Sequence, residues 1–190
     1  MSDLVLGPNS TAQWHTLVRD AEQAAGCALA EELESYLVFL LMRFVAKPEM
    51  AHSVLALEYL AGQASGGGLR HERLRDVGDK CLLYSGLFPQ RARRRRVRLS
   101  YYVDLGRGAY HALAQNTAHQ HADTYEALAE GFVNLMDVLQ IMRRLRGGEA
   151  PLDPIAALEL LRDTGSAGAR RMLREVTDAE PFEAPSDARH

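Results

Sequence analysis

Residues 29–46 read LAEELESYLVFLLMRFVA, and this stretch predicts the fold more clearly than any other part of the chain. Its apolar residues recur every three or four positions, which is the spacing of one face of an α-helix. They are Leu29, Leu33, Tyr36, Leu37, Leu40, Leu41, Phe44 and Val45, and Val38, Phe39 and Met42 spread the apolar surface further around the C-terminal half. A helix that is apolar on most sides must be surrounded by other elements, so we expect it to be the central helix of the core. Pro48 ends it, because the residue before a proline avoids helical geometry.

Helical signals dominate the rest of the chain. Capping residues, apolar faces and terminal glycines predict further helices over about 10–26, 48–61, 74–86, 100–115, 123–146, 153–165 and 166–176. Asp123 and Glu126 resemble a capping box at the start of the fifth of these. We therefore predict an all-α protein with a single domain over 1–176, a bundle of seven or eight helices around the apolar helix 29–46. The polar residues 177–190 are expected to form a disordered tail.

Residues 97–105 are ambiguous. They alternate between apolar and polar residues as a strand does, but residues further along fit a helical face. No second strand is apparent elsewhere, and a lone strand would leave its backbone groups unpaired, so we expect a helix from about Ser100. Gly106 and Gly108 each cost about 1 kcal/mol inside a helix relative to alanine, which predicts a close helix crossing at that point.

The bulk composition is that of a soluble globular protein. The 190 residues are 47% apolar and 25% charged, and the net charge of -3 gives no whole-protein attraction to nucleic acid or anionic lipid. Cys27 and Cys81 are far apart in the sequence, which is typical of a reducing compartment. No signal peptide is apparent, and no apolar run is long enough to span a membrane. We expect a cytoplasmic protein that has no membrane partner.

The most unusual segment runs from Gly86 to Asp104 and contains six arginines and two adjacent tyrosines. The arginines are Arg91, Arg93, Arg94, Arg95, Arg96 and Arg98. Guanidinium groups match carboxylates and phosphates, and Tyr101 and Tyr102 could stack on a base. The simplest interpretation is a solvated turn whose arginines form ion pairs with acidic residues of the same chain. Binding of an acidic protein, a phosphorylated small molecule or a nucleic acid is also compatible; the last is not favoured, because no nucleic-acid-reading module is recognisable.

A second polar set follows on the predicted helix. Asp104, Arg107 and Tyr110 are spaced three apart and share one face. In one interpretation, Asp104 and Arg107 form an ordinary ion pair on the helix surface. In the other, Gly106 and Gly108 allow tight packing, and the set is buried and functional.

The sequence gives little support for a metal site or for a catalytic nucleophile. His111, His119 and His121 lie near Asp123 and Glu126, with residues 119–121 expected in a connection between helices, but the sequence favours exposed polar residues over a metal site. A ferritin-like centre needs two Glu-x-x-His pairs, and only Glu49 with His52 has this spacing. Ser85 lacks the Gly-x-Ser-x-Gly pattern of a nucleophile elbow. We expect no metal and no cofactor.

Residues 79–89 read DKCLLYSGLFP and residues 100–110 read SYYVDLGRGAY. Together they resemble a block found in a family of uncharacterised bacterial all-helical proteins. The resemblance implies a bacterial, cytoplasmic origin, and it transfers no activity and no functional residues.

These observations favour a non-enzymatic interaction or regulatory protein of the bacterial cytoplasm that contacts its partner through residues 88–110. The partner is expected to be a protein or an acidic ligand, and a homodimer is one form of this interpretation. Two alternatives stay open. One is a small-molecule-binding or catalytic protein with a pocket near Asp104, Arg107 and Tyr110; the other is nucleic-acid binding through residues 91–98.

Overall fold

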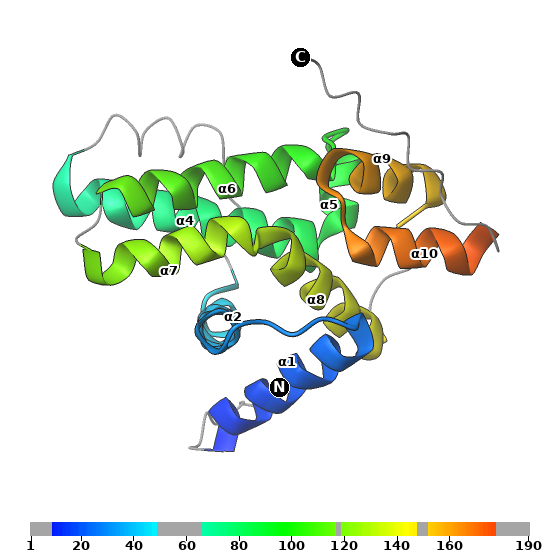
Figure 1. Ribbon diagram of the computed structural model, residues 1–190, viewed down its shortest axis with the longest axis horizontal. Coiled ribbons are helices and arrows are strands. Elements are labelled where there is room, and N and C mark those ends of the chain that lie inside the picture. Colours follow the sequence, from blue (N-terminus) through cyan, green and yellow to red (C-terminus); the bar gives the residue numbers. More distant parts are fainter. Residues whose placement is uncertain (1–8, 49–65, 117–118, 148–151, 178–190) are drawn as a thin grey trace, which may run out of the picture.

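The structure, a computed structural model, describes residues 9–48, 66–116, 119–147 and 152–177. Within these residues all regular elements are helices, nine in number, and they pack into one body (Figure 1). The all-α prediction is confirmed. Most of the predicted helix 48–61 and the predicted tail lie outside the described residues, so neither is tested.

The helices follow the chain in a simple order. They are α1 (Asn9–Ala25), α2 (Glu31–Ala46), α4 (Gly67–Gly86), α5 (Pro89–Arg94), α6 (Leu99–Asn116), α7 (His119–Glu130), α8 (Phe132–Leu145), α9 (Pro154–Thr164) and α10 (Ala167–Thr177). α6 packs against α4 on one side and α7 on the other, while α1 packs against α2 and α8. α9 and α10 form a pair at the end of the body where α6 begins (Figure 1).

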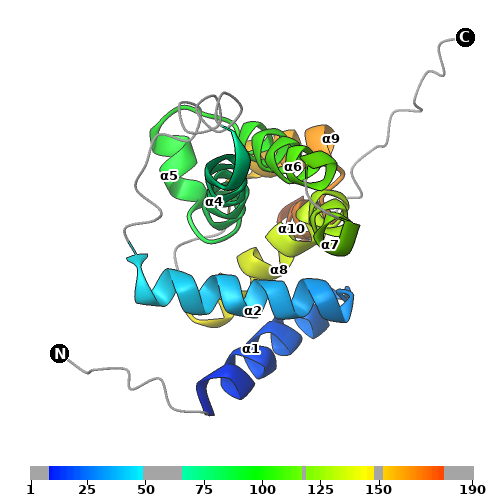
Figure 2. The ribbon, with the colours of Figure 1, turned by 90° about the vertical axis from the view of Figure 1, so that its left-hand side faces the viewer.

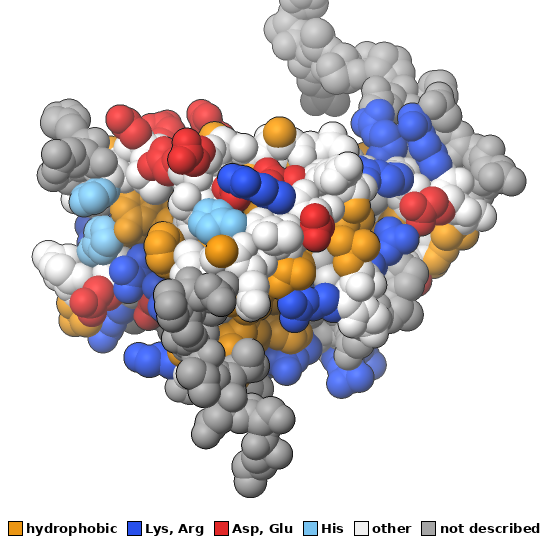
Figure 3. Space-filling view, turned by 90° about the horizontal axis from the view of Figure 1, so that it is seen from below, with side chains coloured by type: hydrophobic (Ala, Val, Ile, Leu, Met, Phe, Trp, Pro, Cys, Tyr) orange, Lys and Arg blue, Asp and Glu red, His pale blue; other side chains and the backbone are white. Residues whose placement is uncertain are grey.

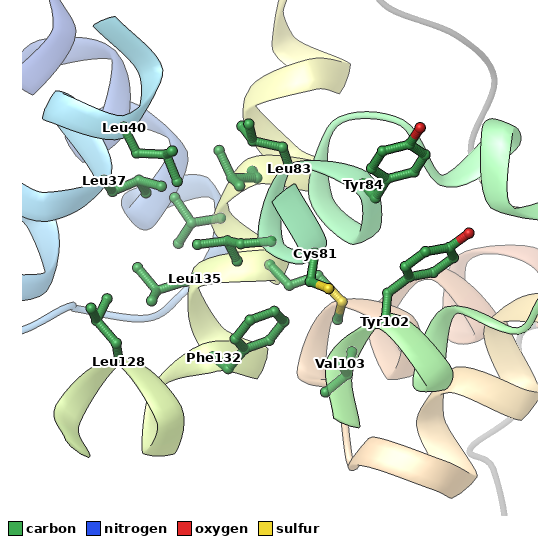
Figure 4. Close-up of a cluster of buried hydrophobic side chains, with 14 of the residues drawn as sticks. Leu37, Leu40, Cys81, Leu83, Tyr84, Tyr102, Val103, Leu128, Phe132 and Leu135 are labelled. Atoms are coloured by element: carbon green, nitrogen blue, oxygen red, sulfur yellow. The ribbon is translucent and has the colours of Figure 1, made fainter. Parts of the chain in front are cut away.

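The apolar helix that the sequence places at the centre is α2, and it lies toward one side of the body, between α1 and the other helices (Figure 2). One side of α2 enters the core through residues such as Leu37 and Leu41, but the Phe39 side chain is 62% exposed. The most enclosed helices are α4 and α8, whose buried positions include Cys81, Leu83 and Leu135 (Figure 4). The apolar surface of α2 is therefore wider than the surface that the core covers.

Residues 99–116 are helical, as the absence of a partner strand predicted. A Cβ atom added at Gly106 would lie 2.5 Å from the ring of Phe132 and 2.8 Å from Cys81 Cβ. The predicted close crossing is confirmed at Gly106, because only a residue without a side chain allows α4, α6 and α8 to approach this closely.

The predicted single helix 123–146 is wrong, because the chain breaks at Gly131 into α7 and α8. A Cβ atom at Gly131 would lie 2.7 Å from the Leu33 side chain of α2. α7 begins at His119, so residues 119–121 lie in a helix and not in a connection, and Asp123 is an exposed interior residue and not a cap. This break and the short helix α5 raise the helix number above the seven or eight expected.

The two C-terminal helices begin and end where the sequence predicts. Asp153 accepts hydrogen bonds from the backbone N–H groups of Ile155 (3.1 Å) and Ala156 (3.0 Å), and Gly165 ends α9 with φ +72°. Ser166 then opens α10, its hydroxyl accepting from Ala169 N–H at 3.0 Å.

Both cysteines are free thiols, Cys81 buried and Cys27 partly buried. Burial raises the pKa of the Cys27 thiol, and the nearby Glu22 carboxylate adds to the rise. In the described part of the chain, no helix combines the length and the apolar character that crossing a membrane requires.

Candidate functional site

The arginine bend, which we define as residues 94–98, joins α5 to α6. α5 is short and is fixed by the fully buried Ala92, whose carbonyl accepts hydrogen bonds from the backbone N–H groups of Arg95 and Val97. Arg96 turns the chain with φ +56°, a left-handed conformation that is uncommon for a residue other than glycine. This sharp turn leaves the side chains of Arg94, Arg95 and Arg96 exposed.

The arginines of this region differ in their contacts. Arg98 faces α9, where its guanidinium lies 3.5 Å from Glu159 and 3.9 Å from Asp163. Arg94, Arg95 and Arg96 form no ion pair with any residue in the part of the chain that the structure describes. Arg91 and Arg95 instead lie over aromatic rings, at 4.4 Å from the Phe88 centroid and 5.7 Å from the Tyr84 centroid.

A cleft of about 390 Å³ lies between the bend, the start of α6 and the start of α9; we call it the bend cleft. Its apolar lining consists of Pro89, Val97, Leu99, Leu152, Ile155, Ala156 and Leu160. Arg96 and Arg98 lie on the bend side, and Asp153 and Glu159 lie on the α9 side. The cleft therefore combines an apolar interior with charges of opposite sign on its two walls.

The adjacent tyrosines have different surroundings. Tyr101 is 43% exposed, whereas Tyr102 is buried and stacks on Tyr84 with ring centroids 5.4 Å apart (Figure 4). Burial also raises the pKa of the Tyr102 hydroxyl. Only Tyr101 is open to a partner, so the prediction that both rings could stack on a base is wrong for Tyr102.

The structure separates the second predicted set. Asp104 is exposed, and Arg107 donates from Nε to the Ala129 carbonyl at 3.1 Å. Among the described residues there is no ion pair between Asp104 and Arg107. Tyr110 is fully buried, and none of the three residues lines either of the two cavities described here.

Tyr110 belongs instead to a buried cluster that the sequence interpretation missed, the Asp79 cluster. Asp79 Oδ1 accepts hydrogen bonds from Tyr36 at 2.6 Å and from Tyr110 at 2.7 Å, and Oδ2 pairs with Arg43. These residues come from α2, α4 and α6, so the cluster joins three helices. Asp79 lies opposite the helical face of Leu74, Val77, Cys81 and Tyr84, so the sequence pattern gave no signal that its carboxylate is buried.

Burial governs the protonation of this cluster. It raises the pKa of Asp79, although the Arg43 guanidinium and the tyrosine hydroxyls favour the charged carboxylate and oppose the rise. Burial, followed by the Asp79 charge, raises the pKa values of Tyr36 and Tyr110 well above their ordinary range. Asp79 and Tyr110 have no exposed surface, so these two side chains hold helices together and offer no atom to a ligand.

A second buried carboxylate, Asp137, organises the start of α10. It accepts hydrogen bonds from the Ser166 hydroxyl at 2.6 Å and from Gly168 N–H at 3.0 Å. Burial raises the pKa of Asp137, while these two hydrogen bonds favour its charged form and oppose the rise. The contacts satisfy the free N–H groups of a helix start, which is a structural role.

The face formed by α1 and α2 shows basic, acidic and apolar side chains interspersed (Figure 3). A second cavity, of about 550 Å³, lies between α1 and the end of α8 and contains one acidic and one basic side chain, Asp20 and Arg146. No group of three potential metal ligands occurs among the described side chains, which include His111 and His121. Beside the bend cleft, Arg94, Arg95 and Arg96 give three consecutive exposed positive charges.

Comparisons with protein-family models, with curated protein sequences and with solved structures found no match to this chain. The resemblance of residues 79–110 to a bacterial family stays a prediction.

Proposed function

We propose that this protein is a non-enzymatic interaction or regulatory protein of the cytoplasm that binds an acidic protein partner through the arginine bend. The observation that supports this function best is the row Arg94, Arg95 and Arg96, exposed and without a carboxylate partner among the described residues. Three adjacent positive charges repel one another, and an acidic partner relieves that repulsion. The net charge of the whole protein is -3, so the positive charge of the bend is local.

A catalytic interpretation has less support. The two most perturbed carboxylates, Asp79 and Asp137, accept all their hydrogen bonds from the protein's own groups and lie outside both cavities. Nucleic-acid binding is also less favoured, because Tyr102 is enclosed and a single exposed tyrosine gives only one stacking surface. An acidic protein therefore fits the bend better than a substrate or a nucleic acid.

The test compares two variants that lose the same charge. The bend variant carries Arg94→Ser, Arg95→Ser and Arg96→Ser; the control carries Arg19→Ser, Arg73→Ser and Arg144→Ser, exposed arginines of α1, α4 and α8. Affinity-tagged wild type and both variants are used to capture proteins from lysate of the source cell after nuclease treatment. We expect the control to retain the wild type's partners and the bend variant to lose them, with wild-type capture weakening as salt rises.

Equal capture by the two variants would overturn this function. Partners that wild type captures from untreated lysate but loses after nuclease treatment would indicate that nucleic acid carries the interaction. Circular dichroism of both variants checks that the helical content is unchanged.

A further inference from the structure

We propose that the bend cleft receives an apolar side chain of the acidic partner, so that the ligand is an acidic peptide segment with one apolar anchor residue. This inference rests on the proposed function and adds to it the kind of sequence that is recognised.

The shape and lining of the cleft support an apolar anchor. Leu99, Leu152 and Leu160 are 8%, 7% and 1% exposed, and they line the cleft with carbon atoms. Ile155 also lines the cleft but is 73% exposed, an unusual position for a branched aliphatic side chain. A volume of about 390 Å³ is larger than one side chain needs, so the cleft accepts a leucine or a phenylalanine together with part of its backbone.

The charges around the cleft select the residues next to the anchor. Glu159 and Asp163 already neutralise Arg98, so the uncompensated positive charge lies at Arg96 and continues to Arg95 and Arg94. On the opposite wall, the negative charge of Asp153 disfavours a second carboxylate. The bound segment therefore carries its acidic residues on one side of the anchor only, the side that faces the bend.

Two exposed residues of α9 give a matched pair of variants. Ile155 lines the cleft, whereas Leu158 is 53% exposed and lies outside the cleft lining. Both side chains are largely in solvent, so Ile155→Ser and Leu158→Ser should leave folding unchanged and differ only in the cleft. Ala156→Phe supplies the opposite change, because it adds a ring to the cleft wall.

The probe is a displayed library of random peptides selected on the immobilised wild-type protein, followed by fluorescence anisotropy of the most enriched peptide. We expect the enriched sequences to share an apolar residue flanked on one side by Asp or Glu. Ile155→Ser and Ala156→Phe should each weaken binding by about tenfold or more, while Leu158→Ser stays within about twofold of wild type. Arg96→Ser should also weaken binding, and added salt should reduce this difference.

Several outcomes would overturn the inference. Absence of an enriched motif, or equal affinity of the Ile155→Ser and Leu158→Ser variants, would show that the cleft receives no anchor. Concentration-dependent dimers in analytical ultracentrifugation that Ile155→Ser abolishes would assign the cleft to a second copy of the chain. Loss of binding in the bend variant with full binding in both cleft variants would leave the proposed function intact and remove only this inference. The lysate capture described above decides the proposed function separately.

Discussion

Asp79 shows how one residue determines the packing of several helices. Its carboxylate has no solvent exposure and contacts Tyr36, Arg43 and Tyr110. A buried carboxylate that lost these partners would be strongly destabilising, so the cluster requires α2, α4 and α6 to keep their positions together.

We predict that Asp79 makes the protein less stable as the pH rises. Burial raises the pKa of Asp79 in the folded state above its unfolded value, so the folded protein holds this proton at pH values where the unfolded chain has lost it. The stability that Asp79 contributes is therefore complete below the unfolded pKa and is lost as the pH rises through the folded pKa. The free energy of unfolding of wild type minus that of Asp79→Asn should fall by about 1.4 kcal/mol for each unit by which the pKa is raised.

Urea unfolding at several pH values between about 3.5 and 7 measures this difference. Tyr110→Phe is the companion variant, because it removes a hydroxyl that favours the charged carboxylate and should make the fall larger. A difference that grows with pH would show that the attraction of Arg43 exceeds the effect of burial.

The residue scale also shows why part of the site was beyond sequence analysis. The bend arginines could be identified from their number alone, and the structure leaves Arg94, Arg95 and Arg96 exposed. Tyr110 was grouped with Asp104 and Arg107, because its true partner, Asp79, is 31 positions earlier in the chain. The spacing of residues along a helix predicts which of them share a face. It does not predict which other helix packs against that face.

At the scale of elements, glycines set how closely helices approach. At Gly78 a Cβ atom would lie 2.4 Å from the Tyr110 ring, and at Gly106 it would lie 2.5 Å from the Phe132 ring. Both positions are inside helices, where glycine is otherwise unfavourable, so the close packing outweighs the loss in helix propensity.

Gly106→Ala should therefore destabilise the protein even though alanine is the better helix former. Overpacking against Phe132 and Cys81 opposes the gain in propensity, and we expect a net loss of about 1–2 kcal/mol in the free energy of unfolding. The matched control is Gly68→Ala in the first turn of α4, where nothing lies within 4 Å of an added Cβ atom and stability should rise slightly. Urea unfolding compares the two variants.

Phe132→Leu combined with Gly106→Ala provides a further check, because a smaller side chain at 132 frees the space that the new methyl group needs. Gly106→Ala should therefore lower the free energy of unfolding by less in the Phe132→Leu background than in wild type. Equal stabilisation by Gly106→Ala and Gly68→Ala would contradict the close crossing.

The elements differ in how well the sequence predicted them. The α9 boundaries follow from Asp153, Pro154 and Gly165, which act within their own turns. The break at Gly131 was not predicted, because a single glycine between two apolar runs is compatible with a continuous helix. The Leu33 side chain of α2 occupies the space that a Cβ atom at Gly131 would need, so a larger residue does not fit at this position. Signals within one turn could be predicted, and a contact with another helix could not.

At the scale of the whole molecule, the first and last described helices are bonded to each other. The Arg171 guanidinium of α10 donates to the carbonyl groups of Ala24 and Ala25 at the end of α1. These carbonyls have no partner within their own helix, so the arginine acts as a cap supplied from almost 150 residues away. The position of α2 has a similar origin: its apolar pattern predicted a helix in the core, but the packing of other helices, chiefly α1 and α7, decides how much of it is covered.

Arg171→Met should lower the free energy of unfolding by about 1.5–3 kcal/mol, because two helix-terminal carbonyls lose a charged donor. The control is Arg144→Met, which removes an exposed ion pair to Glu175 of α10 and should change stability by less than about 1 kcal/mol. Chemical denaturation gives the energies, and hydrogen exchange of α1 amides should quicken only in the first variant. Unchanged exchange in α1 would show that the contact does not hold that helix.

The bond between Arg171 and α1 has a consequence for biosynthesis. A ribosome makes α1 first, but the group that completes the C-terminal end of this helix emerges only after almost all the described chain has been translated. A nascent chain stalled before codon 171 should therefore expose the end of α1 to proteases or chaperones, and release of the finished chain should protect it.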